Sequence, residues 1–285
     1  MTELTIATRA SKLALAQSEL VAGAIMKVFP DVIVRMLTVE TAGDRDQVTA
    51  VAALTELGAF VRAVQSAVLD GRADLAVHSA KDLPVAGPDG LVGFHPIRGE
   101  VADALVGTSL GDLPRAARVG TGSPRREAQL RELRDDLRIV SIRGNVDTRI
   151  SLAVDGSVDA VVLAVAGLDR MGLSEHIAHR FAPHEMIPAP AQGALSIETR
   201  PGTLAAEIAI GLEDDATRAA VDAERSLLEI TGAGCRSALG AFARVEKQRM
   251  VMDAFVSDER GPRRTFVEAD DPISLAQLAM QELGL

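Results

Sequence analysis

Three short segments of the chain place arginines among glycine and small polar residues, at points where an apolar run gives way to a helical pattern. They are residues 7–11, 119–126 and 142–149. The free N–H groups and the dipole of a helix N-terminus favour an anion there, and a guanidinium binds a carboxylate or phosphate through paired hydrogen bonds. A polar helix start with surface arginines is the plain alternative for any one segment. Together the three segments predict a site for a small polyanionic ligand.

A fourth candidate site follows the apolar run that ends at His78. Lys81 and Asp82 are adjacent there, and neighbouring charges ordinarily form a surface ion pair. A strand at this position has its carboxyl end toward the cleft of an open α/β sheet, where a carboxylate among cations stays ionised and can stabilise a developing positive charge. We expect this position for Asp82. For His78 we expect a packed side chain, with proton donation as the alternative.

Cys235 is the only cysteine of the 285 residues, and it follows two closely spaced glycines, Gly232 and Gly234. One thiol forms no internal disulfide, and a single sulfur is a poor basis for a zinc site. Free cysteines are usually buried as small hydrophobic residues. The glycines and the adjacent Arg236 favour instead a presented, reactive thiolate. The residues alone leave both interpretations open.

Other common sites find little support in the sequence. His176, His179 and His184 lie close together but form no metal motif such as His-Glu-x-x-His. We therefore predict a surface helix there and no metal site. Nucleotide binding is weakly supported, because the chain has neither a Walker loop nor a Gly-x-Gly-x-x-Gly motif.

The composition is that of a soluble globular chain of two or three domains, with 47% apolar and 25% charged residues. A net charge of -10, with no Trp or Tyr, argues against nucleic-acid binding. The sequence has no run of 18 apolar residues, so it predicts no membrane span. The first residues do not resemble a secretion signal. A single cysteine fits the reducing cytoplasm. Clustered arginines are still able to make a positive cleft in an acidic protein.

The elements that position these residues follow from hydrophobic periodicity. The first two-thirds of the chain alternates apolar strands with helical stripes, which is typical of parallel α/β architecture. A helix is expected to begin after Ser11 as N-cap. Residues 70–77 resemble residues 155–162, which suggests two lobes of related design facing across a cleft, with chance similarity as the alternative. From about residue 216, a helix, three strands and a last helix predict a small α+β domain.

In order along the chain, these segments resemble the porphobilinogen deaminase (hydroxymethylbilane synthase) family of tetrapyrrole biosynthesis. The resemblance covers almost the whole chain and is highly specific. The matching stretches are residues 6–15, 73–84, 143–149, 163–170 and 188–194, and the loop at Gly234 and Cys235.

The resemblance implies a fold of class α/β, with two lobes resembling type II periplasmic binding proteins and a small C-terminal α+β domain. The first lobe is expected at 1–95 and 190–213, the second at 96–189. The C-terminal domain, which anchors the cofactor, is expected at 214–285. A cytoplasmic monomer is also implied, although the residues themselves do not determine an oligomeric state.

The resemblance further implies a transferase that joins four porphobilinogen units, with loss of ammonia, to a dipyrromethane cofactor held on Cys235 by a thioether, and then releases hydroxymethylbilane by hydrolysis. Asp82 matches the family's catalytic aspartate, which stabilises the azafulvenium cation. The arginines suit the acetate and propionate of each pyrrole. Expected cofactor-binding residues are Cys235, Lys81, Asp82, Thr121, Ser123, Arg125, Arg126, Arg149 and Gly193. Expected substrate-binding residues are Arg9, Ser11, Arg143, Arg149, Arg170 and Gln192.

Two departures from the family pattern concern loops. Residues 44–58 include no lysine, and residues 48–57 no glycine, where the family often has a lysine- and glycine-rich mobile loop. No proline follows soon after Cys235. Three rivals remain: a two-lobed solute-binding or sensor protein, a thiol acyltransferase using Cys235, and an inactive family member. The first of these leaves Cys235 without a role.

Overall fold

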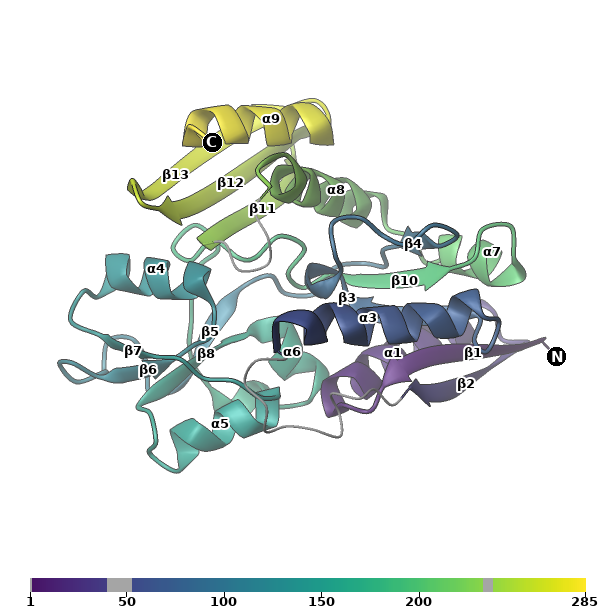
Figure 1. Cartoon of the computed structure of the whole chain (residues 1–285), viewed down its shortest axis with the longest axis horizontal. Helices are drawn as coiled ribbons and strands as arrows, with labels where there is room; N and C mark the ends of the chain where they lie inside the picture. Colours follow the sequence, from purple (N-terminus) through teal and green to yellow (C-terminus); the bar gives the residue numbers. More distant parts are fainter. Residues whose placement is uncertain (1, 40–52, 233–237) are drawn as a thin grey trace. The chain divides into compact units, whose positions relative to one another are not determined.

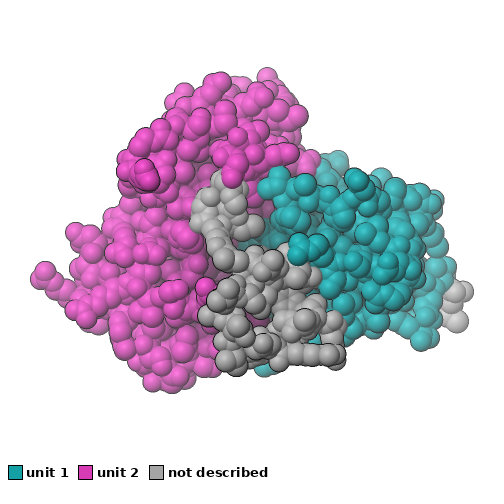
Figure 2. Space-filling view, viewed as in Figure 1, with its two compact units in different colours: residues 1–98, 194–218 teal, residues 99–193, 219–285 magenta. Residues whose placement is uncertain are grey.

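The computed structural model describes residues 2–39, 53–232 and 238–285, without the side chains of residues 53–60. The chain forms two compact units (Figure 2). Unit 1 comprises Met1–Arg98 and Ala194–Arg218, and unit 2 comprises Gly99–Gly193 and Ala219–Leu285. The finer division into two lobes and a third domain, with the boundaries given above, stays a prediction.

Unit 1 is built on a five-stranded mixed sheet of order β2-β1-β3-β10-β4 (Figure 1). The elements are β1 (Thr2–Arg9), α1 (Lys12–Val28), β2 (Val32–Val39), α3 (Ala53–Leu69), β3 (Leu75–Ser79), the 3₁₀ turn η1 (Ala80–Asp82), β4 (Val92–Phe94), β10 (Leu195–Thr199) and α7 (Leu204–Ile210). β1 pairs in parallel with β2 and β3, whereas β10 runs antiparallel to β3 and β4. The carboxyl ends of β1 and β3 therefore lie at the same edge.

Helices cover both faces of this sheet. Val21 and Ile25 of α1 and Ile208 of α7 pack against one face, and Val64 and Val68 of α3 pack against the other. The predicted N-cap is confirmed, since the Ser11 side chain accepts a hydrogen bond from the first turn of α1. The central strands are buried on both faces, which explains their nearly continuous apolar sequence.

Unit 2 contains a second five-stranded sheet, of order β7-β6-β8-β5-β9. Its elements are β5 (Asp103–Gly107), β6 (Arg118–Gly120), α4 (Pro124–Leu133), β7 (Arg138–Val140), α5 (Val146–Val154), β8 (Ala160–Ala164), α6 (Val165–Arg170), the 3₁₀ turn η2 (Ser174–His176) and β9 (Ile177–Arg180). β6 is parallel to β7 and β8, and β5 is antiparallel to β8 and β9. The two sheets thus share strand order and directions, which accounts for the similarity of residues 70–77 and 155–162.

The helix expected around the three histidines is wrong. Residues 174–176 form a single 3₁₀ turn, and β9 pairs antiparallel with β5 at the edge of the sheet. Ile177 and His179 are half-buried, whereas Ala178 and Arg180 are exposed. This alternation is the period of a strand, and a four-residue strand shows it too briefly to be recognised from sequence.

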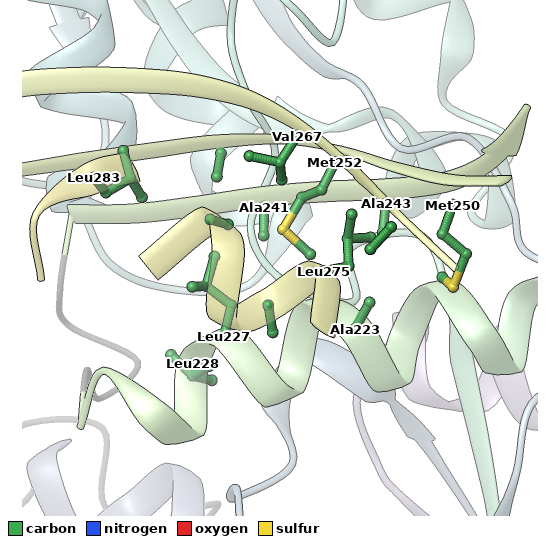
Figure 3. Packing of buried hydrophobic residues seen from close by; sticks show 14 of the residues in the cluster. Ala223, Leu227, Leu228, Ala241, Ala243, Met250, Met252, Val267, Leu275 and Leu283 are labelled. Carbon is green, nitrogen blue, oxygen red and sulfur yellow. The ribbon is translucent and has the colours of Figure 1, made fainter. Parts of the chain in front are cut away.

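The C-terminal residues form the small α+β part that the sequence predicts. Its elements are α8 (Asp215–Ile230), which begins in unit 1, then β11 (Ala238–Glu246), β12 (Arg249–Asp258), β13 (Gly261–Ala269) and α9 (Pro272–Leu283). The three strands form an antiparallel sheet. Leu227, Met252 and Leu275 pack between this sheet and the two helices (Figure 3). No described helix of the chain is long and apolar enough to cross a membrane.

Candidate active site

Unit 1 has a pocket of about 70 Å³ at the carboxyl ends of β1 and β3. It brings together Arg9, Ser11 and Asp82, three residues that the sequence singles out. The other lining residues are Leu13, Ala14, Gln17, Val61, Val77, His78 and Ser79. An arginine, a carboxylate and several hydroxyl and amide groups thus surround one small space, which suits a polar ligand with both acceptors and donors.

Asp82 lies at the end of η1, the 3₁₀ turn that directly follows β3. The backbone N–H of Ala80 donates to the carbonyl of Ala194 at 3.0 Å, and that of Leu83 donates back to Ala80. Both bonds fix the turn on the sheet, so the backbone of Asp82 is held in place. Lys81 is half-buried on the same turn and does not line the pocket.

Gln17 was not singled out from the sequence, yet it orders one wall of the pocket. Its side chain is 4% exposed, and Nε2 donates to Ser79 Oγ at 2.8 Å. The contact ties α1 to the carboxyl end of β3. A glutamine on an otherwise amphipathic helix gives no sequence signal, because its partner is 62 residues away.

His78 belongs to a buried row of polar side chains that extends from the pocket into the interior of unit 1. It is 7% exposed, and its Nε2 lies 3.1 Å from Oε2 of Glu198 on β10, at an angle that makes no hydrogen bond. Gln65 of α3 donates from Nε2 to both oxygens of Glu198, at 3.1 and 2.9 Å. His78 is therefore a packed residue, as expected, and it lies next to the carboxylate of Glu198.

Unit 2 holds the arginines of the second predicted segment in a different way. Arg125 and Arg126 begin α4 after the predicted Pro124 start, and their side chains are buried. Arg125 Nη2 donates to Asp103 Oδ2 at 2.7 Å, and Arg126 Nη2 donates to Oδ1 at 2.6 Å. Asp103 itself is fully buried. The two cofactor-binding candidates are thus paired inside the unit with a carboxylate that the sequence analysis missed.

The charges of this buried trio are mutually dependent. Burial alone raises the pKa of Asp103, but attraction and hydrogen bonds from Arg125 and Arg126 outweigh burial and hold that pKa well below its ordinary 3.8. Burial lowers the pKa of Arg125, and Arg126 adds repulsion, while Asp103 opposes both. Two guanidinium groups against one carboxylate leave one surplus positive charge.

The turn before α4 is tight. Ser123 is the N-cap of α4, and its Oγ accepts the N–H of Arg126. Thr121 is buried, and its Oγ1 accepts the N–H of Ser123 at 3.2 Å. A Cβ on Gly122 would lie 2.7 Å from the carbonyl oxygen of Ile142. The hydroxyl groups of Thr121 and Ser123 therefore both stabilise this turn through hydrogen bonds. The turn also packs directly on Ile142, the first residue of the third arginine segment.

That third segment is more open. Arg143 is exposed, and Arg149, half-buried on α5, donates from Nε to the carbonyl of Gly144 at 2.8 Å. Gly144 has φ +106°, a conformation that a side chain strains. Arg143 and Arg149 thus flank a turn that needs glycine, at the start of a helix.

Arg170, Gln192 and Gly193 meet in unit 2 where two segments run side by side. Arg170 donates from Nη2 to the carbonyl of Gly193, and burial lowers the pKa of Arg170 to about 10, although Asp169 opposes that shift. Gln192 donates to the carbonyl of Val101 at 2.8 Å. Gly193 has φ +86°, and a Cβ there would lie 2.7 Å from the Gly99 carbonyl oxygen. These three residues hold backbone together in the present structure.

Some predicted features lie outside the described residues. They are Cys235, its neighbour Arg236 and residues 44–52 of the lysine-free stretch; the rest of that stretch begins α3. Within the described part, no three His, Cys, Asp or Glu side chains gather as a metal site would require.

The described geometry supports binding and charge stabilisation. One pocket pairs a carboxylate with an arginine at the end of two strands, and a second site stores surplus positive charge beside a helix start. The pocket of unit 1 by itself suits a polar ligand that develops positive charge, and the arginine pair of unit 2 by itself suits a carboxylate.

Comparison with known proteins gives consistent matches. The family model described as "Porphobilinogen deaminase, dipyromethane cofactor binding domain" matches residues 4–207. A porphobilinogen deaminase of Maridesulfovibrio salexigens is 41% identical over 95% of this chain and 90% of its own. One from Acidothermus cellulolyticus is 43% identical over 95% and 85%.

The fold class predicted from the sequence is confirmed by the two mixed sheets and the small antiparallel sheet. A solved periplasmic substrate-binding protein of an ABC transporter, from Coxiella burnetii, covers 73% of this chain and 91% of its own, with a TM-score of 0.45 and 14% identity. That superposition is too loose to carry a functional conclusion. The family model and the near full-length identity are sufficient by themselves, and the chain belongs to the porphobilinogen deaminase family.

Proposed function

We propose that this chain is a porphobilinogen deaminase, a transferase that condenses four porphobilinogen units with loss of ammonia and releases hydroxymethylbilane by hydrolysis. Family membership over nearly the whole chain is the observation that carries this proposal. Porphobilinogen is the substrate, and a dipyrromethane held by a thioether on Cys235 is the cofactor. When bound, the cofactor supplies the primer to which substrate pyrroles are added.

The surplus positive charge of unit 2 supports a role in holding that cofactor. Arg125 and Arg126 share a single carboxylate in a buried setting, and a buried charge without a counterion is costly. Acetate and propionate groups are the anions this arrangement suits. We assign cofactor contacts to residues at and near the start of α4 and to Gly193, with the more open Arg143 and Arg149 available to substrate carboxylates. The assigned cofactor residues are Thr121, Ser123, Arg125, Arg126, Arg149 and Gly193.

In unit 1 we assign the chemical step to Asp82. Its carboxylate accepts pyrrole N–H groups and faces the positive charge that develops on porphobilinogen when the C–N bond breaks and ammonia leaves with the bonding electrons. Arg9 and Ser11, in the same pocket, bind the carboxylates of the unit that is entering. Lys81 adds positive charge from the neighbouring turn position. We also assign Arg170 and Gln192 to substrate binding, and their hydrogen bonds to the carbonyls of Gly193 and Val101 support the backbone that carries Gly193.

We also propose that the enzyme is cytoplasmic and monomeric. A cytoplasmic enzyme agrees with a single cysteine that must stay reduced until it is alkylated. A monomer follows from the family resemblance alone, and light scattering of the purified chain is the measurement that decides it.

Intact mass spectrometry tests the proposed function directly. The native chain is expected to carry an adduct of two pyrrole units, and Cys235→Ser is expected to carry none. Porphobilinogen consumption is measured on the same samples, and only the chain with the adduct is expected to turn over. A native chain that consumes no porphobilinogen, even after preincubation with it to build the cofactor, would contradict the proposal.

A further inference from the structure

We propose that Asp103 is a positioning residue of this enzyme, whose carboxylate sets the guanidinium groups of Arg125 and Arg126 and the amide of Gln192 in place for carboxylate binding. This inference rests on the proposed function, because it assigns Asp103 a part in holding the anionic groups of that reaction. Asp103 belongs to unit 2 and is not among the residues that line the pocket of unit 1.

The carboxylate of Asp103 accepts four hydrogen bonds from three side chains. Oδ1 accepts from Nε and Nη2 of Arg126, at 3.1 and 2.6 Å, and from Nε2 of Gln192 at 2.9 Å. Oδ2 accepts from Nη2 of Arg125 at 2.7 Å. All these side chains are buried. One group at the start of β5 therefore orients side chains from the first turn of α4 and from the segment before β10.

The opposite edges of the two guanidinium groups are also held. Arg125 Nη1 donates to the carbonyl of Ile187 at 2.6 Å, and Arg126 Nη1 donates to the carbonyl of Val162 at 2.8 Å. Gln129 also binds the backbone of Ile187. Its Oε1 accepts the Ile187 N–H at 2.7 Å, and its Nε2 donates to the Ile187 carbonyl at 3.0 Å. Each arginine is thus fixed between Asp103 and a backbone carbonyl, so removal of Asp103 frees one edge of both.

The charge count explains why one carboxylate suits this position. Two buried guanidinium groups without a counterion would repel each other and destabilise α4. Two carboxylates would neutralise the pair and remove its attraction for an anion. Asp103 alone leaves one surplus positive charge. Among the described residues, Asp103 is the one carboxylate that interacts with Arg125. Folding and anion binding therefore both depend on Asp103.

Asp103 also acts on the turn before α4. Arg126 donates its backbone N–H to the N-cap Ser123, and Ser123 in turn donates to Thr121. Because Gly122 lies against the Ile142 carbonyl, this turn has little room to adjust. A displacement of the Arg126 side chain is therefore transmitted to the two hydroxyl groups assigned to the cofactor.

The test compares Asp103→Asn with Asp136→Asn. Asp136 is a matched control, because it is also a carboxylate of unit 2 that binds an arginine. Nε and Nη2 of Arg134 donate to it at 2.6 and 2.8 Å, and these hydrogen bonds do not involve the first turn of α4. Both variants are loaded as holoenzyme and verified by intact mass. The measurements are kcat and KM for porphobilinogen, and backbone hydrogen exchange of peptides covering 121–130 and 187–193.

For Asp103→Asn we expect KM for porphobilinogen to rise about tenfold with a smaller fall in kcat, because Asp103 orders Gln192, a substrate-binding group, and not the reacting atoms. We expect exchange about tenfold faster in the two peptides. Asp136→Asn is expected to leave KM and both peptides unchanged. If Asp103→Asn does not fold, Asp103→Glu, which keeps the charge but moves the oxygens, is expected to show the same rise in KM.

An unchanged KM in the variant that folds, or unchanged exchange in both peptides, would overturn the inference. Loss of stability with no change in KM would do the same, because it would make Asp103 merely structural. Failure of the proposed function has a different signature: the native chain and Asp136→Asn would consume no porphobilinogen. The exchange comparison still decides whether Asp103 positions the arginines in that case.

Discussion

The two sheets of the protein share strand order and directions, yet they use arginine in different ways. In unit 1, Arg9 ends β1 and lines a pocket with Asp82. In unit 2, Arg125 and Arg126 are buried on Asp103. Each sheet also has a buried carboxylate on its antiparallel inner strand, which is Glu198 on β10 and Asp103 on β5.

The difference follows from where the arginine stands relative to the helix N-cap. Arg9 comes two residues before the N-cap Ser11, so it belongs to the end of the strand. Arg125 and Arg126 follow the N-cap Ser123, in the first turn of α4, and their side chains face the sheet. A shift of a few residues across the cap thus converts a pocket-lining cation into a buried cation paired with Asp103.

The largest effect is expected from Asp82→Asn. Without the carboxylate, the positive charge of the reacting pyrrole loses its main stabilisation, and kcat is expected to fall about a thousandfold. The measurement is the initial rate of porphobilinogen consumption. Asp70→Asn is the control, because Asp70 forms an exposed ion pair with Arg72 in the same unit. Equal rates for both variants would remove Asp82 from the chemical step.

The next effect concerns the buried carboxylate of unit 1. Glu198→Gln leaves His78 and Gln65 without their charged partner, and the free energy of unfolding is expected to fall by about 3 kcal/mol. Urea unfolding followed by circular dichroism measures it. Asp74→Asn, a half-buried residue that accepts the N–H of Thr5, is a milder comparison in the same sheet. A loss at Glu198 no larger than at Asp74 would mean that the His78 pair is not a structural counterpart of the Asp103 cluster.

Stability is expected to depend on pH through Asp103. Its pKa is lower in the folded chain than the ordinary 3.8, so the unfolded chain binds the proton more readily, and its contribution to stability is fully present above about pH 4. That contribution is lost progressively as the pH falls toward the folded pKa. Thermal unfolding between pH 6 and pH 3 is expected to show a steeper decline for the native chain than for Asp103→Asn. Parallel declines would show that Asp103 does not contribute.

The smallest effects are expected at the two equivalent N-caps. Ser11 Oγ accepts the N–H of Ala14 at 3.3 Å, and Ser123 Oγ accepts that of Arg126 at 3.4 Å. Each Ser→Ala change is expected to cost about 1 kcal/mol of stability. Ser11→Ala is also expected to raise KM for porphobilinogen, since Ser11 lines the pocket. If neither change affects stability, the shared cap chemistry of the two turns is wrong.

Local sequence signals predicted much of the fold. Ser11 as a cap and Pro124 as a first helical residue were correct, because caps and proline act over a few residues. The three strands of the C-terminal sheet, with a helix before and after them, were also predicted. β9 was missed, since a four-residue edge strand depends on pairing with β5 rather than on its own sequence.

The site was predictable only in part for the same reason. Asp82 and Arg9 stand at strand ends, which are recognisable positions. Asp103 and Glu198 are single carboxylates at or within apolar strands, and their partners are more than 20 residues away in sequence. A charge inside an apolar run is the signal that could have found both, because such a charge requires a buried partner. Its meaning depends on tertiary contacts that periodicity does not supply.

The central claim is that Asp82 acts in every addition, whereas Cys235 anchors the cofactor once. The most direct measurement is the intact mass of Asp82→Asn before and after mixing with porphobilinogen. The account predicts an adduct of two pyrrole units that is present at the start and gains mass far more slowly than in the native chain. An Asp82→Asn chain that gains further pyrrole units at the native rate would contradict it.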